Sequence, residues 1–237
     1  MTCAADLPFR GYASVSTDDS QRLISGWVYE AMQPEVANAA AAAVSAPLDQ
    51  VPRQHGPVKL THVAHAFLAY WWHVRGDKIM PDATDIVIPQ LRTLAPYVRY
   101  MHWDGDKLIH RLWGSALTEG IGLDLTGHDA LAYIPEERRD ANRNLFRSLH
   151  THQCGLVVLV RNDSRSEGLM AELTFLPVAT GPGKPQRLIG TMQWRRAEGA
   201  SVVLPIESGK PQELNLEAIL FLDLGAGLPD QDLLAGL

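Results

Sequence analysis

The chain has little of what several classes of protein depend on. It contains two cysteines in 237 residues, Cys3 and Cys154, which are too few for a disulfide framework or for a zinc site made of four cysteines. No apolar run reaches about 18 residues, so we expect no membrane-spanning helix. The first residues have neither the basic nor the apolar segment of a secretory signal, so we expect a cytoplasmic protein.

Positive charge is also scarce. The net charge is -6, which argues against a general nucleic-acid-binding protein. Residues 198–237 account for this balance, because they hold seven acidic residues against one lysine, Lys210. Hydrophobic residues make up 46% and charged residues 20% of the chain, which is typical of a globular protein, and the length allows one or two domains.

Known catalytic motifs are absent as well. The sequence has no phosphate-binding loop, no Gly-x-Ser-x-Gly, no His-Glu-x-x-His and no dinucleotide-binding fingerprint. It also has no segment that indicates a DNA-binding helix-turn-helix. We therefore expect a protein that is not an enzyme.

What is present begins with a helix signal after residue 56. Residues 1–56 have few large apolar side chains, and we expect a partly flexible extension with a short helix near residues 21–32. Apolar residues then recur at helical spacing, which predicts a helix of about four turns ended by Arg75 and Gly76. The stripe consists of Leu60, Val63, Ala64, Phe67, Leu68, Trp71 and Trp72.

From residue 97 the apolar period changes from helical spacing to two. Residues 97–103 and 107–113 flank Asp104-Gly105-Asp106, which predicts a β-hairpin. We expect only short helical turns in 114–135, a second long helix over 136–149, and strands over 155–161, 168–178 and 187–194. This order is typical of an α+β fold whose antiparallel sheet is covered on one face.

Several motifs in this region resemble a known family. In chain order they are Trp71-Trp72, Arg75-Gly76 with Pro81, Leu94-Ala95-Pro96, Arg111-Leu112-Trp113-Gly114-Ser115, Gly122-Leu123-Asp124-Leu125-Thr126-Gly127 and Leu176-Pro177. Together they are similar to the bacterial family of short, stand-alone PAS-like domains.

The resemblance implies a five-stranded antiparallel sheet with the strand order 2-1-5-4-3 and helices that enclose a ligand cavity. It places the domain at 57–197, with an N-terminal helical extension over 1–56 and an acidic C-terminal extension over 198–237. It implies sensing or protein interaction, not catalysis, and it specifies no cofactor.

The tryptophans suggest a ligand site. Trp103, Trp113 and Trp194 lie on predicted strands, and in a PAS sheet alternate residues of such strands face the cavity. We expect these rings to wall a small apolar ligand, with His110 or Arg111 as the polar anchor. The alternative is that they only fill the core.

Two rival interpretations stay open. In the first, the same cavity is the pocket of a small enzyme that uses His110, Arg111 and Glu119 as its polar groups. In the second, the core is filled and the domain is a structural adaptor. Convergent side chains with shifted pKa values would favour the enzyme, an apolar cavity the sensor, and a solid core the adaptor.

Other groups point to partners. The stripe with Phe67, Trp71 and Trp72 is wide enough that it must be buried, and we expect a homodimer interface there. Arg139, Arg143 and Arg147 form an i, i+4, i+8 row. This row can grip an anion or an acidic protein partner, or it can pair within the chain with Glu136 or Asp140.

The histidines do not predict a metal site. His62, His65 and His73 share a helix, and His150, His152 and Cys154 alternate near a strand, but no acidic ligand accompanies either group. We expect polar surfaces there and no metal. Alternating leucines over residues 214–224 predict either an addition to a sheet edge or a partner-binding element.

The sequence therefore predicts a PAS-like sensory or regulatory domain. We expect it to bind a small ligand, a protein partner or both, to form a homodimer, and to bind neither nucleic acid nor membrane.

Overall fold

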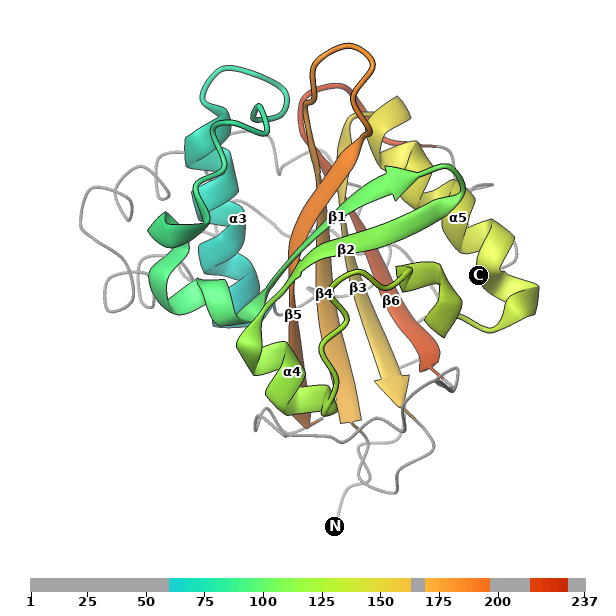
Figure 1. Cartoon of the computed structure of the whole chain (residues 1–237). Helices are drawn as coiled ribbons and strands as arrows, with labels where there is room; N and C mark the ends of the chain where they lie inside the picture. Colours follow the sequence, from blue (N-terminus) through green and yellow to red (C-terminus); the bar gives the residue numbers. More distant parts are fainter. Residues whose placement is uncertain (1–59, 163–168, 197–213, 230–237) are drawn as a thin grey trace, which may run out of the picture.

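A six-stranded antiparallel sheet organises the chain. The computed structural model describes residues 60–162, 169–196 and 214–229 (Figure 1). The predicted helix near residues 21–32 lies outside these ranges. The strands are β1 (Val98–Asp104), β2 (Lys107–Trp113), β3 (Cys154–Asn162), β4 (Leu169–Val178), β5 (Arg187–Arg196) and β6 (Leu214–Asp223). The helical elements are α3 (His62–Arg75), η2 (Ile88–Tyr97), α4 (Ser115–Ile121), η3 (Ala130–Tyr133) and α5 (Glu136–Thr151).

The strand order confirms the predicted topology. The strands lie side by side as β2-β1-β5-β4-β3-β6, which contains the expected order 2-1-5-4-3 of a PAS sheet. The sixth strand, β6, pairs antiparallel with β3, with Leu156 opposite Phe221. Of the two interpretations of residues 214–224, the addition to a sheet edge is therefore confirmed.

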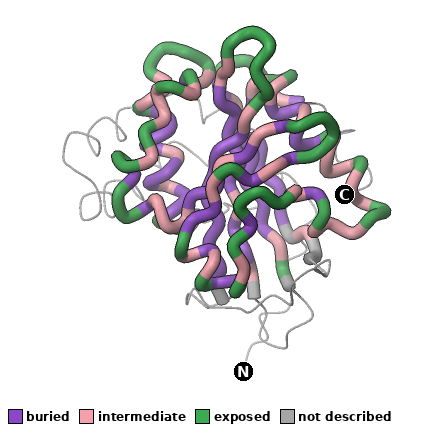
Figure 2. The backbone as a smooth tube through the Cα atoms, viewed as in Figure 1, coloured by how far each residue is buried: buried purple, intermediate pink, exposed green. Residues whose placement is uncertain are grey.

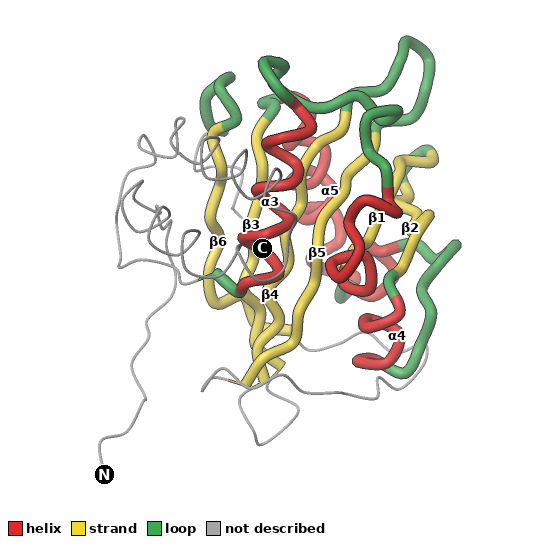
Figure 3. The backbone as a smooth tube through the Cα atoms, turned by 90° about the vertical axis from the view of Figure 1, so that its left-hand side faces the viewer, coloured by secondary structure: helices red, strands yellow, loops and turns green. Residues whose placement is uncertain are grey.

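Helix α3 covers one face of this sheet. Thr61 caps its start, because the Thr61 side chain accepts a hydrogen bond from the Ala64 N–H. Gly76 follows its end with a φ of 56°, a conformation that favours glycine. Its apolar stripe belongs to one buried cluster with side chains of the sheet, among them Val157 of β3 and Leu220 of β6, and Figure 3 shows α3 lying against the sheet.

This packing corrects the prediction of a homodimer interface. Phe67 and Trp71 are 0% exposed and Trp72 is 7% exposed within the single chain. The wide stripe is buried, as expected, but against the sheet of the same chain. These three aromatic side chains are therefore not available to a second copy.

Helices α4, η3 and α5 cover the opposite face. Alternate residues of β3 show the two-sided arrangement, because Val157 and Leu159 pack under α3 whereas Leu156 and Val158 pack toward α5. The buried positions run along the strands and the exposed ones gather in the loops (Figure 2). The expectation of helices on one face thus holds for α4, η3 and α5, with α3 on the other.

A β-bulge in the first hairpin decides which side chains face α5. The register shifts between Tyr100 and Met101, so that Tyr100 pairs with Leu112 and Met101 pairs with His110. Arg111 is the extra residue. In a regular strand His110 and Trp113 would point to opposite faces, but one inserted residue brings both to the same face.

Candidate functional site

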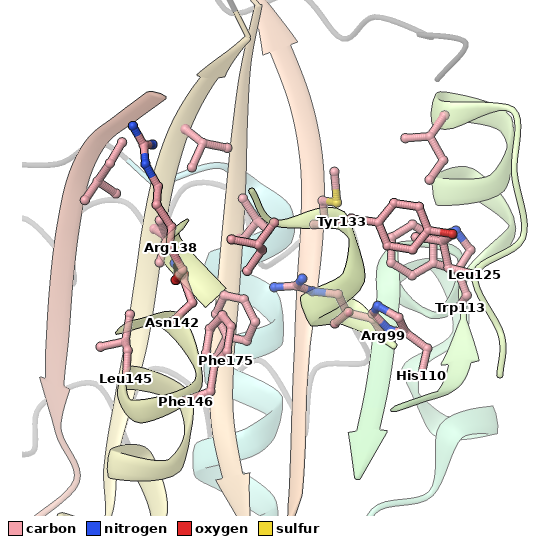
Figure 4. Close-up of a pocket in the computed structure, with 18 of the residues that line it drawn as sticks. Arg99, His110, Trp113, Leu125, Tyr133, Arg138, Asn142, Leu145, Phe146 and Phe175 are labelled. Atoms are coloured by element: carbon pink, nitrogen blue, oxygen red, sulfur yellow. Dashed lines mark hydrogen bonds between the residues drawn. The ribbon is translucent and has the colours of Figure 1, made fainter. Parts of the chain in front are cut away.

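A cavity of about 220 Å³ lies between the sheet and the helical layer of α4, η3 and α5 (Figure 4). One wall consists of side chains from all six strands, and the other comes from α4, η3, α5 and the loops between them. The lining is mainly apolar, with Phe146 and Phe175 in contact at 4.6 Å between ring centroids. The lining also carries a few polar side chains, which come from β1 and β2 in the sheet wall and from η3 and α5 in the helical wall.

Three of the five predicted ligand residues meet in this cavity. His110, Trp113 and Trp194 line it, as expected from their places on the outer and central strands. His110 and Trp113 touch edge to face, with ring centroids 4.8 Å apart. The bulge in β2 is the reason that both reach it.

The other two residues lie elsewhere, which corrects the prediction. Trp103 is buried outside the cavity lining, where the Arg147 guanidinium lies 4.3 Å from its ring centroid. Arg111 is exposed, because it is the extra residue of the bulge. It cannot serve as the polar anchor of a buried ligand.

One cation that lines the cavity was not among the residues predicted from the sequence. Arg99 on β1 is 4% exposed and lines the cavity, with its guanidinium directed toward Phe175 in Figure 4. Its Nη2 donates a hydrogen bond to the Thr174 carbonyl oxygen at 3.2 Å, and the guanidinium carbon lies 4.0 Å from the centroid of the Phe175 ring. The period of two could have identified it, since Arg99 alternates with Met101 and Trp103.

Gly190 makes room for this arrangement. It pairs with Arg99 across β1 and β5, and a Cβ on Gly190 would lie only 1.7 Å from the Thr174 carbonyl oxygen. The Thr191 N–H donates instead to the Thr174 hydroxyl at 2.7 Å. The Thr174 carbonyl is therefore able to accept from Arg99.

Burial changes the acid–base properties of both nitrogen-bearing groups. It lowers the pKa of Arg99 to about 9. Burial, followed by the positive charge of Arg99, lowers the pKa of His110 to about 3. At neutral pH the site thus combines a charged guanidinium with a neutral imidazole.

Several nitrogen atoms at the cavity have no hydrogen-bond partner among the described residues. They are Arg99 Nε, His110 Nδ1, Trp113 Nε1 and Trp194 Nε1. The lining formed by the described residues contains no Asp or Glu. Buried polar groups are normally satisfied, so this arrangement is suited to binding a molecule that supplies acceptors.

The groups of the rival enzyme do not assemble. Of His110, Arg111 and Glu119, only His110 lines the cavity, whereas Arg111 and Glu119 are exposed. A side chain on the solvent side of α4 or of the hairpin cannot act on a molecule held beneath them. The prediction that these three residues together form the polar groups of an enzyme site is therefore corrected.

The arginine row of α5 is used inside the chain. Arg139 Nε donates to the Ile134 carbonyl at 2.8 Å, and Arg143 Nε donates to the Asp106 carbonyl at 3.2 Å. Arg147 Nη2 donates to the Gly105 carbonyl at 2.7 Å. These side chains attach α5 to the segment just before it and to the β1–β2 turn. The prediction that the row binds an anion or an acidic partner is corrected accordingly.

The alternative within the chain is confirmed for one pair, since Arg143 bonds to Asp140.

The described residues contain neither a cluster of metal ligands nor a helix that could span a membrane. Within residues 60–162, 169–196 and 214–229, no group of three His, Cys, Asp or Glu is arranged to hold a metal ion. None of the helices described is both long and apolar enough to cross a membrane.

Comparison with known proteins bears on the whole region. Residues 60–193 match the profile of a family described as "PAS domain". Among solved structures, the chain is similar to "Structure of an RNA-binding Light-Oxygen-Voltage Receptor", with 15% sequence identity and a TM-score of 0.31. That alignment covers 73% of this chain and 52% of the other, so this chain spans about half of its length. The comparison with curated proteins gave no match.

Proposed function

By its match over residues 60–193 the chain belongs to the PAS domain family, and we propose that it is a non-enzymatic sensory or regulatory domain that binds a small ligand beneath α5. The cavity of about 220 Å³ is the observation that carries this proposal. Protein interiors are packed closely and hold few voids larger than a water molecule. A cavity of this size speaks against the adaptor with a filled core.

The size of the cavity favours a small molecule. Pockets for drug-sized ligands usually have volumes of about 300–1,000 Å³, and this one is smaller. Its lining is mainly aliphatic and aromatic, with Leu173, Phe175 and Val158 on the sheet side and Phe146 on the helix side. We therefore expect a ligand with an apolar body.

Ligand binding would act on α5, because this helix forms much of the second wall. Helix α5 is fastened to the β1–β2 turn by Arg143 and Arg147. A change in the packing of α5 would therefore move the hairpin with it. Binding of a protein partner that responds to this change remains a prediction. The apolar stripe that suggested a homodimer is buried within the single chain, so it no longer supports one.

Native mass spectrometry of the freshly purified full chain tests the proposal. We expect an additional non-covalent mass that is lost on denaturation, or binding of the neutral probes 1-hexanol and benzyl alcohol in ligand-observed NMR. Leu173→Trp, which fills the cavity, should abolish either signal. The matched control Leu112→Trp adds the same bulk on the opposite face and should keep it.

A bare protein that binds neither probe would contradict the proposal. So would probe binding that survives Leu173→Trp, because the bound molecule would then lie outside this cavity.

A further inference from the structure

The polar groups of the cavity are matched to a particular kind of ligand. We infer that the cavity takes a small monocarboxylate with an apolar body, and that its carboxylate pairs with the guanidinium of Arg99. This inference rests on the proposed function and specifies the chemical class of the ligand.

Arg99 has no counter-ion among the described residues. Arg99 is 4% exposed, and its only hydrogen bond among the described residues goes to a neutral acceptor, the Thr174 carbonyl. None of the ion pairs in the described ranges includes it, and no Asp or Glu of those ranges lines the cavity. A buried charge is ordinarily paired, because removing it from water without a partner is costly.

The guanidinium of Arg99 has a hydrogen-bond donor that no described residue uses. Arg99 Nε is buried and has no hydrogen-bond partner among the described residues, and the Arg99 side chain lines the cavity (Figure 4). A guanidinium binds a carboxylate through two parallel N–H···O bonds, which is the geometry that Nε and a terminal nitrogen offer together. Trp113 and Trp194 also line the cavity, and their indole N–H groups have no hydrogen-bond partner in the part of the chain that the structure describes.

The charges of the cavity suit a ligand with one negative charge. His110 is neutral at neutral pH, because burial and the adjacent Arg99 oppose its protonation. The other cation of the lining, Arg138, comes from α5 and lies on the far side of the cavity from Arg99 in Figure 4. A dianion at Arg99 would thus leave one charge uncompensated in an apolar site.

Apolar side chains beyond Arg99 would surround the rest of the ligand. From Arg99 on β1 the cavity continues across β4 and β3, over Leu173 and Val158 and under the Phe146 ring. Leu173, Val158 and Phe146 offer only carbon atoms to the ligand body. An aliphatic or aromatic chain fits over these three side chains, whereas a hydroxyl group placed there would be buried without a partner.

The test compares carboxylates with neutral molecules of the same shape. Hexanoate and phenylacetate are titrated into the ligand-free full chain against hexanamide and phenylacetamide, with calorimetry and ligand-observed NMR as readouts. We expect the carboxylates to bind at least tenfold more tightly than the amides. Arg99→Gln should remove this preference, so that the carboxylates bind no more tightly than the amides.

Two controls keep the result interpretable. Arg111→Gln removes a positive charge from the neighbouring strand outside the cavity, and it should keep the preference. Arg99→Lys retains the charge without the bidentate fork, so it should keep part of the preference; it also serves if Arg99→Gln does not fold.

Each remaining outcome decides the matter. Equal binding of carboxylates and amides, or a carboxylate preference that survives Arg99→Gln, would overturn the inference and leave the proposed function standing. Failure of the acids, the amides and the neutral alcohols alike would overturn both.

Discussion

Replacing Arg99 by methionine should not destabilise the ligand-free protein. Methionine keeps an unbranched stem in the same space and removes the buried charge together with its hydrogen bond to the Thr174 carbonyl. Truncating one partner of a buried charge pair normally costs about 3–5 kcal/mol. We expect instead that Arg99→Met raises the free energy of unfolding by about 1 kcal/mol.

The magnitude follows from opposing contributions. Burial lowers the pKa of Arg99 from 12.5 to about 9, and each pKa unit corresponds to about 1.4 kcal/mol, so the buried charge costs about 5 kcal/mol at neutral pH. The variant loses the hydrogen bond to Thr174, worth about 2 kcal/mol. It also loses the contact with the Phe175 ring, worth about 2 kcal/mol when desolvated.

The pH dependence has a defined sign. Because the pKa of Arg99 is lower in the folded protein, the unfolded chain binds more protons between about pH 9 and pH 12.5. Wild-type protein therefore gains stability relative to the variant as the pH rises above 9. Between pH 7 and pH 10 the difference should change by about 1.4 kcal/mol in favour of wild type.

Urea unfolding followed by tryptophan fluorescence measures both quantities. Ligand is first removed by unfolding the protein and refolding it after gel filtration, and the two proteins are compared at pH 7 and pH 10. A loss of more than about 3 kcal/mol at pH 7, or a difference that does not depend on pH, would refute the reasoning. Either result would mean that the chain itself supplies an anion to Arg99.

Four further predictions concern the scaffold. Gly190→Ala should destabilise the fold by about 3 kcal/mol in urea unfolding, because its Cβ would lie 1.7 Å from a backbone carbonyl oxygen of β4; an unchanged midpoint would contradict the close approach. Cys154 is 0% exposed and burial raises its pKa to about 12, so a thiol reagent at pH 8 should label it only in denaturant, as peptide mapping would detect. Thr61→Ala should lower the free energy of unfolding by roughly 2 kcal/mol through loss of the helix cap and of its hydrogen bond to a buried carboxylate, whereas Thr61→Ser should retain most of it. Trp71→Ala should cost about 3–5 kcal/mol without changing the elution volume in gel filtration, and a shift from dimer to monomer would restore the interface prediction.

The sequence predicted the fold well because the signals are local. The helix of α3 follows from the apolar spacing between Thr61 and Gly76, and the hairpin follows from Asp104-Gly105-Asp106 between two alternating runs. The five-stranded order came from the resemblance, and the pairing register confirms it. None of these conclusions required knowledge of what lies across the sheet.

The candidate site was only partly predictable. His110, Trp113 and Trp194 line the cavity, but Arg111 was predicted as a polar anchor and Arg99 was not predicted as a site residue. A strand with a strict period of two cannot place both His110 and Trp113 inward, and the bulge that does so has no unambiguous signature in the sequence. The period of two places Arg99 on the same face as Met101 and Trp103, but it does not show that this face is covered by helices.

By itself, then, the sequence determined the elements and their succession along the chain, because helical and strand periods and turn residues act over a few positions, and its motifs indicated the family. The tertiary structure decided where the polar groups point. Phe67 and Trp71 are core residues because the sheet, including β4 and β5, lies beneath α3, and Arg143 and Arg147 of α5 are occupied because the β1–β2 turn lies beside them. The buried charge of Arg99 depends on the absence of a side chain at Gly190, a position 91 residues away that only the pairing of β1 with β5 brings opposite to it.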